Sequence, residues 1–224
     1  MRSFLKNVAV ARSRIPESGW LYTFHLTIQH VVPSWLFSIK IWTTGIGEIE
    51  EIEVKPDKNL GLRWADTNDI VALMAMGQTR EDFKNAFSNG EEIALCEAAG
   101  RIVAYYRMSP NQVEFSDWLR INLRNGSVYG GSLWVLPAYR GQDIGPELVR
   151  FGLAKMAEEG FQRWVFHVDA LNRNSFRATN KVADTSTLGR LIFIRVLGVV
   201  FIKYGALSRI GFLNSQNRLV IELG

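Results

Sequence analysis

The sequence has a single cysteine, Cys96, among its 224 residues, so no disulfide can form within the chain. It also lacks any long stretch that is both apolar and uncharged. The most apolar stretch, residues 191–207, contains Arg195 and Lys203, whereas a membrane-spanning helix needs about 20 mostly apolar residues. Residues 1–14 carry four basic residues and no apolar core of the length that a secretory signal needs. We therefore expect no transmembrane segment and a cytoplasmic protein.

Clusters of metal ligands and of basic residues are absent as well. The one cysteine and the three histidines show no paired spacing with acidic residues, so no metal site is predicted. The net charge of +4 suits an anionic ligand such as a nucleotide phosphate. Basic residues do not gather with aromatic ones as they do in nucleic acid-binding proteins. We therefore expect no nucleic acid partner.

Two regions differ in composition. Residues 1–57 are rich in aromatic side chains and end in an alternating, strand-like segment at residues 48–54, followed by a turn at Pro56-Asp57. We predict that residues 1–57 form an N-terminal extension or small subdomain and that residues 58–224 form the main domain. The N-terminal aromatic side chains could cover the acceptor side of a site, form the contact of a homodimer or build a plain core.

From residue 58 onward, strand patterns and helix patterns are mixed. Apolar runs predict strands at residues 60–64, 92–98, 101–108, 127–136 and 163–170, and two or three more within residues 188–223. Capping residues and apolar stripes predict helices at residues 70–76, 79–89, 144–159 and 174–181. The polar segment 109–125 is expected to be a solvated connection or an acceptor-binding loop. This order predicts a mixed α/β fold.

One strand-to-helix connection carries a candidate binding site. The strand ends at Pro137, the loop contains Arg140 and Gly141, and the helix begins at Ile144. Such a loop presents several backbone N–H groups in one direction, and the helix N-terminus adds partial positive charge. With the Arg140 side chain, the segment suits a pyrophosphate. A plain turn with a glycine for geometry is the alternative.

This segment resembles the signature of the GNAT superfamily of N-acyltransferases, V-x-P-x-x-R-G-x-G-I-G between a strand and a helix. The matching residues are Val135, Pro137, Arg140, Gly141, Ile144 and Gly145. A second family motif matches downstream at Asn172, Ser175 and Lys181. Residues 60–70 also resemble the first strand and helix of the family, so the resemblance runs from residue 60 to the end.

The resemblance implies a largely antiparallel central sheet flanked by helices, and an acyltransferase that uses acetyl-coenzyme A or another acyl-coenzyme A. The amine of a small acceptor attacks the thioester carbonyl directly in this family. A main-chain N–H of Trp134 or Val135 would bind the oxyanion, on a strand splayed from its neighbour. The implied donor-binding residues are Leu133, Trp134, Val135, Arg140, Gly141, Gln142, Asp143, Ile144, Gly145, Asn172 and Ser175.

Some residues depart from the family pattern. Asp143 stands where glycine is usual, and a carboxylate there repels a pyrophosphate unless it caps the helix and points away. Thr179 replaces the tyrosine that protonates the leaving thiolate, and Ala183-Asp184 replaces Gly-Phe. No acid lies on the strand before the signature. Candidate bases are therefore Tyr129, His167 and Asp169; a hydrogen-bonded core residue is the alternative for His167.

Two further functions stay open. Gly130-Gly131 could leave room for a bulky acceptor or for a fatty acyl chain delivered by acyl carrier protein, although glycines there also suit a bulge or close backbone packing. The changes at Asp143 and Thr179 would also be compatible with a GNAT-like module that binds without catalysis.

Overall fold

The computed structural model describes residues 32, 36–49, 52, 54, 60–76, 79–110, 112–116, 119–212 and 219–223. The turn predicted at Pro56-Asp57 and most of the N-terminal aromatic residues lie outside this part of the chain. No described helix is long and apolar enough to cross a membrane.

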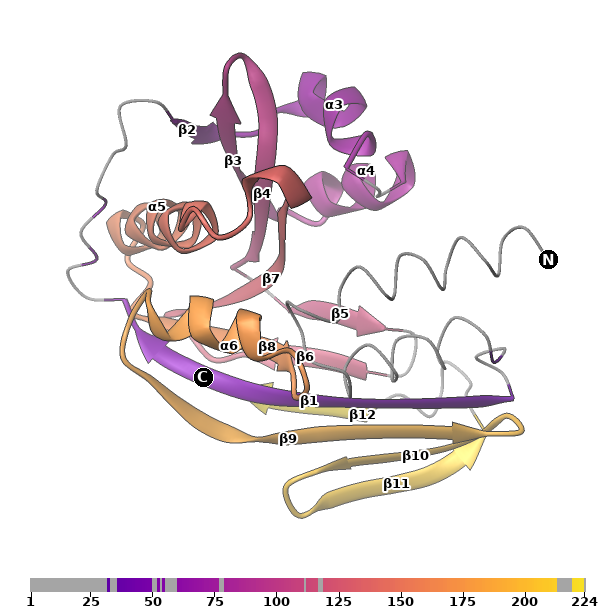
Figure 1. Cartoon of the computed structure of the whole chain (residues 1–224). Helices are drawn as coiled ribbons and strands as arrows, with labels where there is room; N and C mark the ends of the chain where they lie inside the picture. Colours follow the sequence, from indigo (N-terminus) through magenta and orange to yellow (C-terminus); the bar gives the residue numbers. More distant parts are fainter. Residues whose placement is uncertain are drawn as a thin grey trace.

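A nine-stranded sheet forms the frame of the protein (Figure 1). Its strands are β1 Phe37–Glu48, β2 Gly61–Trp64, β3 Glu92–Ala98, β4 Arg101–Ser109, β7 Ser127–Val135, β8 Arg163–Asp169, β9 Thr185–Val196, β10 Val199–Tyr204 and β11 Leu207–Phe212. Their order in the sheet is β11-β10-β9-β1-β8-β7-β4-β3-β2. All neighbours are antiparallel except β7 and β8, which are parallel. The predicted mixed, largely antiparallel fold is therefore confirmed.

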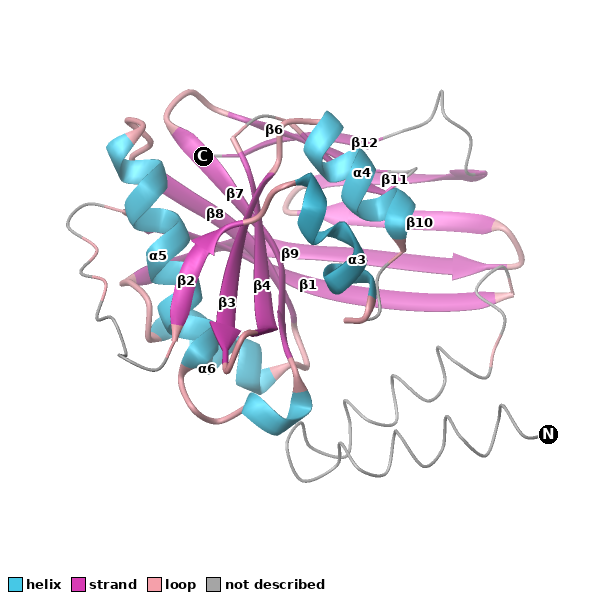
Figure 2. Ribbon diagram, turned by 90° about the horizontal axis from the view of Figure 1, so that it is seen from above, coloured by secondary structure: helices cyan, strands magenta, loops and turns pink. Residues whose placement is uncertain are grey.

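Helices cover both faces of one half of this sheet. They are α3 Ile70–Met74, α4 Arg80–Ser88, α5 Ile144–Glu158 and α6 Arg173–Asn180, with short 3-10 turns at Thr67–Asp69 and Pro137–Tyr139. Seen from above, α5 lies on one side of β2, β3 and β4, and α3 and α4 lie on the other (Figure 2). Alternate residues of β3 pack in opposite directions: Cys96 faces the α5 cluster and Leu95 faces the α3–α4 cluster. Cys96 is fully buried in this strand.

A second sheet covers the other half. Strands β5 Val113–Ser116, β6 Leu119–Leu123 and β12 Leu219–Leu223 form it in the order β12-β6-β5. Its apolar side chains pack on those of β8, β9 and β10. The segment 109–125 is thus not the connection or loop that we expected. Within the described part of residues 185–223 there are four strands, where we expected two or three. The last of them, β12, pairs with β6, which is distant in the sequence.

Strand β1 comes from the region predicted as an N-terminal extension. It is an interior strand, antiparallel to β8 on one side and to β9 on the other. The strand ends at Glu48, the first residue of the alternating segment 48–54, and the other described residues of that segment, Ile49, Ile52 and Val54, are not in a strand. A domain boundary at residue 57 stays a prediction, but residues 37–48 belong to the central sheet.

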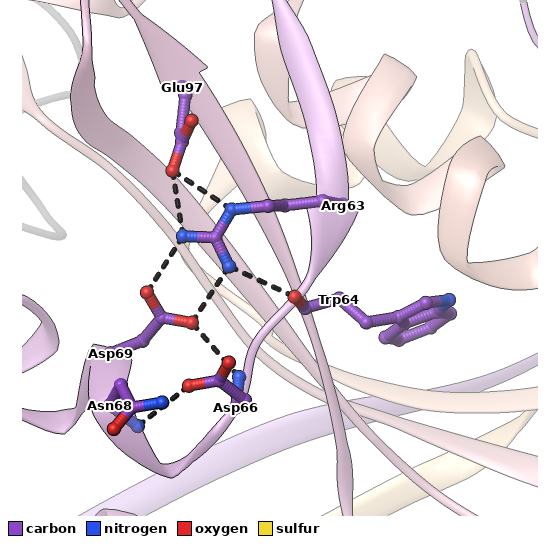
Figure 3. Close-up of polar contacts among 6 residues, drawn as sticks. All are labelled: Arg63, Trp64, Asp66, Asn68, Asp69 and Glu97. Carbon is purple, nitrogen blue, oxygen red and sulfur yellow. Dashed lines mark hydrogen bonds and ion pairs between the residues drawn. The ribbon is translucent and has the colours of Figure 1, made fainter.

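Strand β2 forms the edge of the sheet opposite β11. Its Arg63 connects this edge to β3 and to the turn after β2 (Figure 3). Its guanidinium donates to both carboxylate oxygens of Asp69, at 2.7 and 2.8 Å, to Glu97 Oε1 from two nitrogens, at 2.7 and 2.9 Å, and to Trp64 O at 3.0 Å. All five N–H donors of the side chain are therefore used. The hydrogen bonds from Arg63 lower the pKa of the Asp69 carboxyl group. Asp69 and Asp66 also cap the first turn reciprocally.

Candidate active site between strands β7 and β8

Strands β7 and β8 separate within the sheet. Their parallel pairing runs from Ser127 and Arg163 to Gly130 and Phe166 and then stops. Strand β7 nevertheless continues to Val135, paired with β4 on its other side. The split that the resemblance implies is therefore present, on the β8 side of residues 131–135.

The main chain of β7 offers two residues to this gap. The Leu136 N–H donates to Val103 O of β4 at 2.9 Å, and in an antiparallel ladder every second residue faces the same partner. Trp134 therefore forms its main-chain bonds with Tyr105 of β4, while those of Leu133 and Val135 face the gap. Of the two N–H groups expected to bind an oxyanion, only that of Val135 points the right way.

The loop after β7 is open and carries one cationic side chain, Arg140. Gly141 and Asp143 adopt left-handed conformations, with φ of 79° and 55°, and a Cβ on Gly141 would meet nothing within 4 Å. Arg140 Nε donates to Val135 O at 3.1 Å, and the guanidinium lies 5.4 Å from the centre of the Trp134 ring. The loop is thus held against β7 by Arg140.

Asp143 does not cap α5, contrary to one of our expectations. The helix has no side-chain cap, and the Asp143 carboxylate accepts from Lys181 Nζ at 2.5 Å. The left-handed backbone at Asp143 explains why glycine is usual at this position in the family. Lys181 therefore offsets the negative charge that Asp143 brings to the loop.

Helix α6 borders the gap from the β8 side. Its N-cap residue Asn172 accepts from Ser175 N–H through Oδ1 at 3.1 Å, which leaves the Asn172 NH₂ group for another partner. Thr179, at the position of the family's tyrosine, donates through Oγ1 to Ser175 O at 2.8 Å. The Thr179 hydroxyl hydrogen is therefore engaged within its own helix.

A cavity of about 1110 Å³ follows the gap. All the predicted donor-binding residues line it except Gln142, whose side chain donates to Ala138 O at 3.3 Å. Tyr129 and His167 line it too. It is also lined by residues that we did not predict as site residues: Trp42, Glu91, Tyr106, Arg107, Trp164 and Phe166. They escaped prediction because only the folded sheet brings β1, β4, β8 and the residue before β3 together.

Burial shifts the pKa of two of the predicted bases, His167 and Tyr129, in opposite directions. Burial lowers the pKa of His167 to about 3, so its imidazole stays neutral. Its Nε2 lies 2.9 Å from Thr44 Oγ1, and its Nδ1 is buried without a partner among the described residues. Burial also raises the pKa of Tyr129. Asp169 accepts from Leu171 N–H at 2.9 Å. Burial thus keeps the His167 imidazole and the Tyr129 phenol uncharged.

Gly130 serves close packing rather than open space. A Cβ at this position would lie 2.0 Å from Tyr106 Oη and 2.2 Å from Trp164 Nε1. These two buried side chains share a hydrogen bond of 2.9 Å, donated by Trp164. The register of β4 against β7 also shifts here, between Tyr106 and Met108. The room that we considered for a long acyl chain is therefore filled at Gly130.

The described residues contain no group of three or more histidine, cysteine or acidic side chains placed to hold a metal ion.

Comparison with known proteins decides the family. Residues 62–182, more than half of the chain, match the model of the acetyltransferase (GNAT) family. The chain belongs to the GNAT family of acetyltransferases. No curated protein matches its sequence.

Solved structures share the GNAT fold at low sequence identity. A GNAT-family protein of Novosphingobium aromaticivorans has a TM-score of 0.50 and 14% identity over 69% of this chain and 62% of its own. A Drosophila protein has a TM-score of 0.55 and 14% identity over 79% of this chain and 56% of its own. A glucosamine N-acetyltransferase region of a fungal multi-domain β-N-acetylglucosaminidase has a TM-score of 0.54 and 12% identity, over 70% of this chain and 21% of that protein. The match thus spans less than two thirds of each of these proteins.

Proposed function

We propose that this GNAT protein transfers a short acyl group, such as acetyl, from coenzyme A to the primary amine of a small molecule. The observation that carries the proposal is the end of the β7–β8 pairing at Gly130, next to a loop that carries Arg140 and lines the same cavity. Such a gap can receive a pantetheine arm as an extra strand, and such a loop can bind the pyrophosphate.

The reaction then needs one preorganised donor and no side-chain base. The nitrogen of the uncharged amine attacks the thioester carbonyl carbon, the C–S bond breaks, and the proton that nitrogen loses ends on the sulfur of the coenzyme A thiol. Val135 N–H faces the gap and binds the developing oxyanion, an effect of about 3 kcal/mol for a single donor. The state of His167 and Tyr129 favours an acceptor that enters as the free amine.

The packing at the base of the gap favours a short acyl group. Tyr106 and Trp164 fill the space beside Gly130, and the rings of Trp164 and Phe166 lie 4.4 Å apart. A fatty acyl chain therefore finds no room beside Gly130 itself. This packing speaks against the long-chain alternative with acyl carrier protein.

The test is titration calorimetry with acetyl-coenzyme A, together with release of the coenzyme A thiol in the presence of amines. We expect micromolar binding, weakened about tenfold in Arg140→Ala because one charge-assisted contact is lost. Arg101→Ala, an exposed arginine on β4, is the matched control and should bind as the unmodified protein does. Absence of binding would refute the proposal, and binding without turnover of any amine would favour the non-catalytic module.

A further inference from the structure

Four rings from four strands line the cavity on the sheet face opposite α5. They are Trp42 of β1, Phe115 of β5, Tyr129 of β7 and His167 of β8. Phe115 is central: its ring centre lies 5.0 Å from that of Trp42, edge to face, and 5.2 Å from that of His167, while Tyr129 and His167 are 5.7 Å apart. Rings that line a cavity, such as those of this aromatic wall, can pack against a flat apolar ligand.

Two of the acidic side chains that line the cavity are already paired with arginines. Glu91 forms an ion pair with Arg107 at 2.8 Å, and Glu114 forms one with Arg120 at 2.6 Å. A ligand with several positive charges gains most from carboxylates that lack such partners. This pairing therefore favours a ligand with a single basic group.

One buried polar atom of the wall awaits a partner. His167 Nδ1 is buried and unpartnered among the described residues, while Nε2 contacts Thr44 Oγ1. Thr44 is also hydrogen-bonded to Tyr204. If Thr44 donates to Tyr204, its oxygen accepts from Nε2–H, and Nδ1 is left as an acceptor. An unpaired buried nitrogen is unfavourable, so a ligand hydroxyl or amine hydrogen that reaches Nδ1 stabilises the complex.

We propose that the acceptor is a small monoamine with a flat aromatic body, which packs against Trp42, Phe115 and His167 and donates a hydrogen bond to His167 Nδ1. This inference rests on the proposed acyl transfer and adds the chemical class of its acceptor. The amine group then extends from the aromatic wall toward the gap between β7 and β8.

The test compares tyramine with spermidine and glucosamine as acceptors, with acetyl-coenzyme A as the donor. We expect kcat/KM for tyramine to exceed that for either of the others by at least about 30-fold, because only tyramine has an aromatic ring that can pack against the aromatic wall. Phe115→Leu should raise KM for tyramine about tenfold and leave the Kd for acetyl-coenzyme A unchanged. His167→Phe keeps a ring but removes Nδ1, and should raise the same KM about tenfold.

Phe201→Leu on β10, the same change in a half-buried side chain that does not line the cavity, is the matched control and should leave KM unchanged. Preference for spermidine or glucosamine, or equal effects of Phe115→Leu and Phe201→Leu, would overturn the inference and leave the proposed acyl transfer standing. Failure to bind acetyl-coenzyme A would overturn both.

Discussion

Arg63 and His167 each connect elements of the central sheet, and they differ in how fully their polar atoms are paired. Arg63 uses all five of its donors on Asp69, Glu97 and Trp64 (Figure 3). His167 uses Nε2 on Thr44 and leaves Nδ1 buried without a partner among the described residues. A saturated group of this kind stabilises the fold, whereas an unsaturated buried group in a cavity is available to a ligand.

The largest expected effect is on the free energy of unfolding at acidic pH. The unfolded-state pKa of His167 is about 6.5 and its folded-state pKa is about 3. The unfolded chain therefore takes up the proton first, and the contribution of neutral His167 is complete above about pH 6.5 and lost as the pH falls toward 3. Between pH 7 and 4.5 the free energy of unfolding should fall by about 2–3 kcal/mol more in the unmodified protein than in His167→Phe. Urea unfolding at the two pH values measures this.

Since His25 and His30 are common to both proteins, the difference between them isolates His167. Equal losses in the two proteins would mean that His167 is not held neutral in the folded state.

The saturated cluster should affect stability and not catalysis. Arg63→Met leaves Asp69 and Glu97 without their partner, and we expect a loss of about 1–2 kcal/mol, limited because the Arg63 side chain is 40% exposed. Denaturant unfolding at pH 7 measures it, with kcat/KM unchanged. The control is Lys155→Met, which breaks the exposed pair with Glu158 and should lose only about 0.3 kcal/mol. A fall in kcat/KM for Arg63→Met would contradict a purely structural role.

The smallest expected effect lies at Asp143, whose partner Lys181 would be shared with an anionic ligand. Asp143→Gly removes a carboxylate from the loop, frees Lys181 and suits the φ of 55°. The Kd for coenzyme A should fall about threefold to tenfold, as measured by calorimetry. Asp143→Asn keeps the side-chain size and should give most of this gain if charge is the cause. Unchanged affinity in both variants would place the phosphates elsewhere.

Local patterns predicted the elements formed by short-range contacts. Helix α5 was expected at residues 144–159 and occupies Ile144–Glu158, and the hairpin of β3 and β4 lies where its apolar runs predicted it. Strands β5 and β6 were missed because their sheet is completed by β12, whose residue Leu219 pairs with Leu119. Strand β1 was read as part of an extension for the same reason: its partners lie far along the chain.

The sequence predicts the loop side of the candidate site but not its aromatic side. The loop from Arg140 to Gly145 is contiguous in sequence, and its motif identified it. The aromatic wall combines Trp42, Phe115, Tyr129 and His167 from separate strands, so no spacing in the sequence brings them together. The low pKa of His167 depends on burial and was equally beyond the reach of sequence.

The interior position of β1 has a consequence for the order of assembly. A ribosome makes β1 before β8, since Thr44 and its partner His167 are 123 residues apart, and β9 comes later still. The edge of β8 has no neighbour on that side until the early strand docks, and pairings between such distant segments form slowly. The cavity that β1 and β8 line should therefore be completed only when the sheet closes.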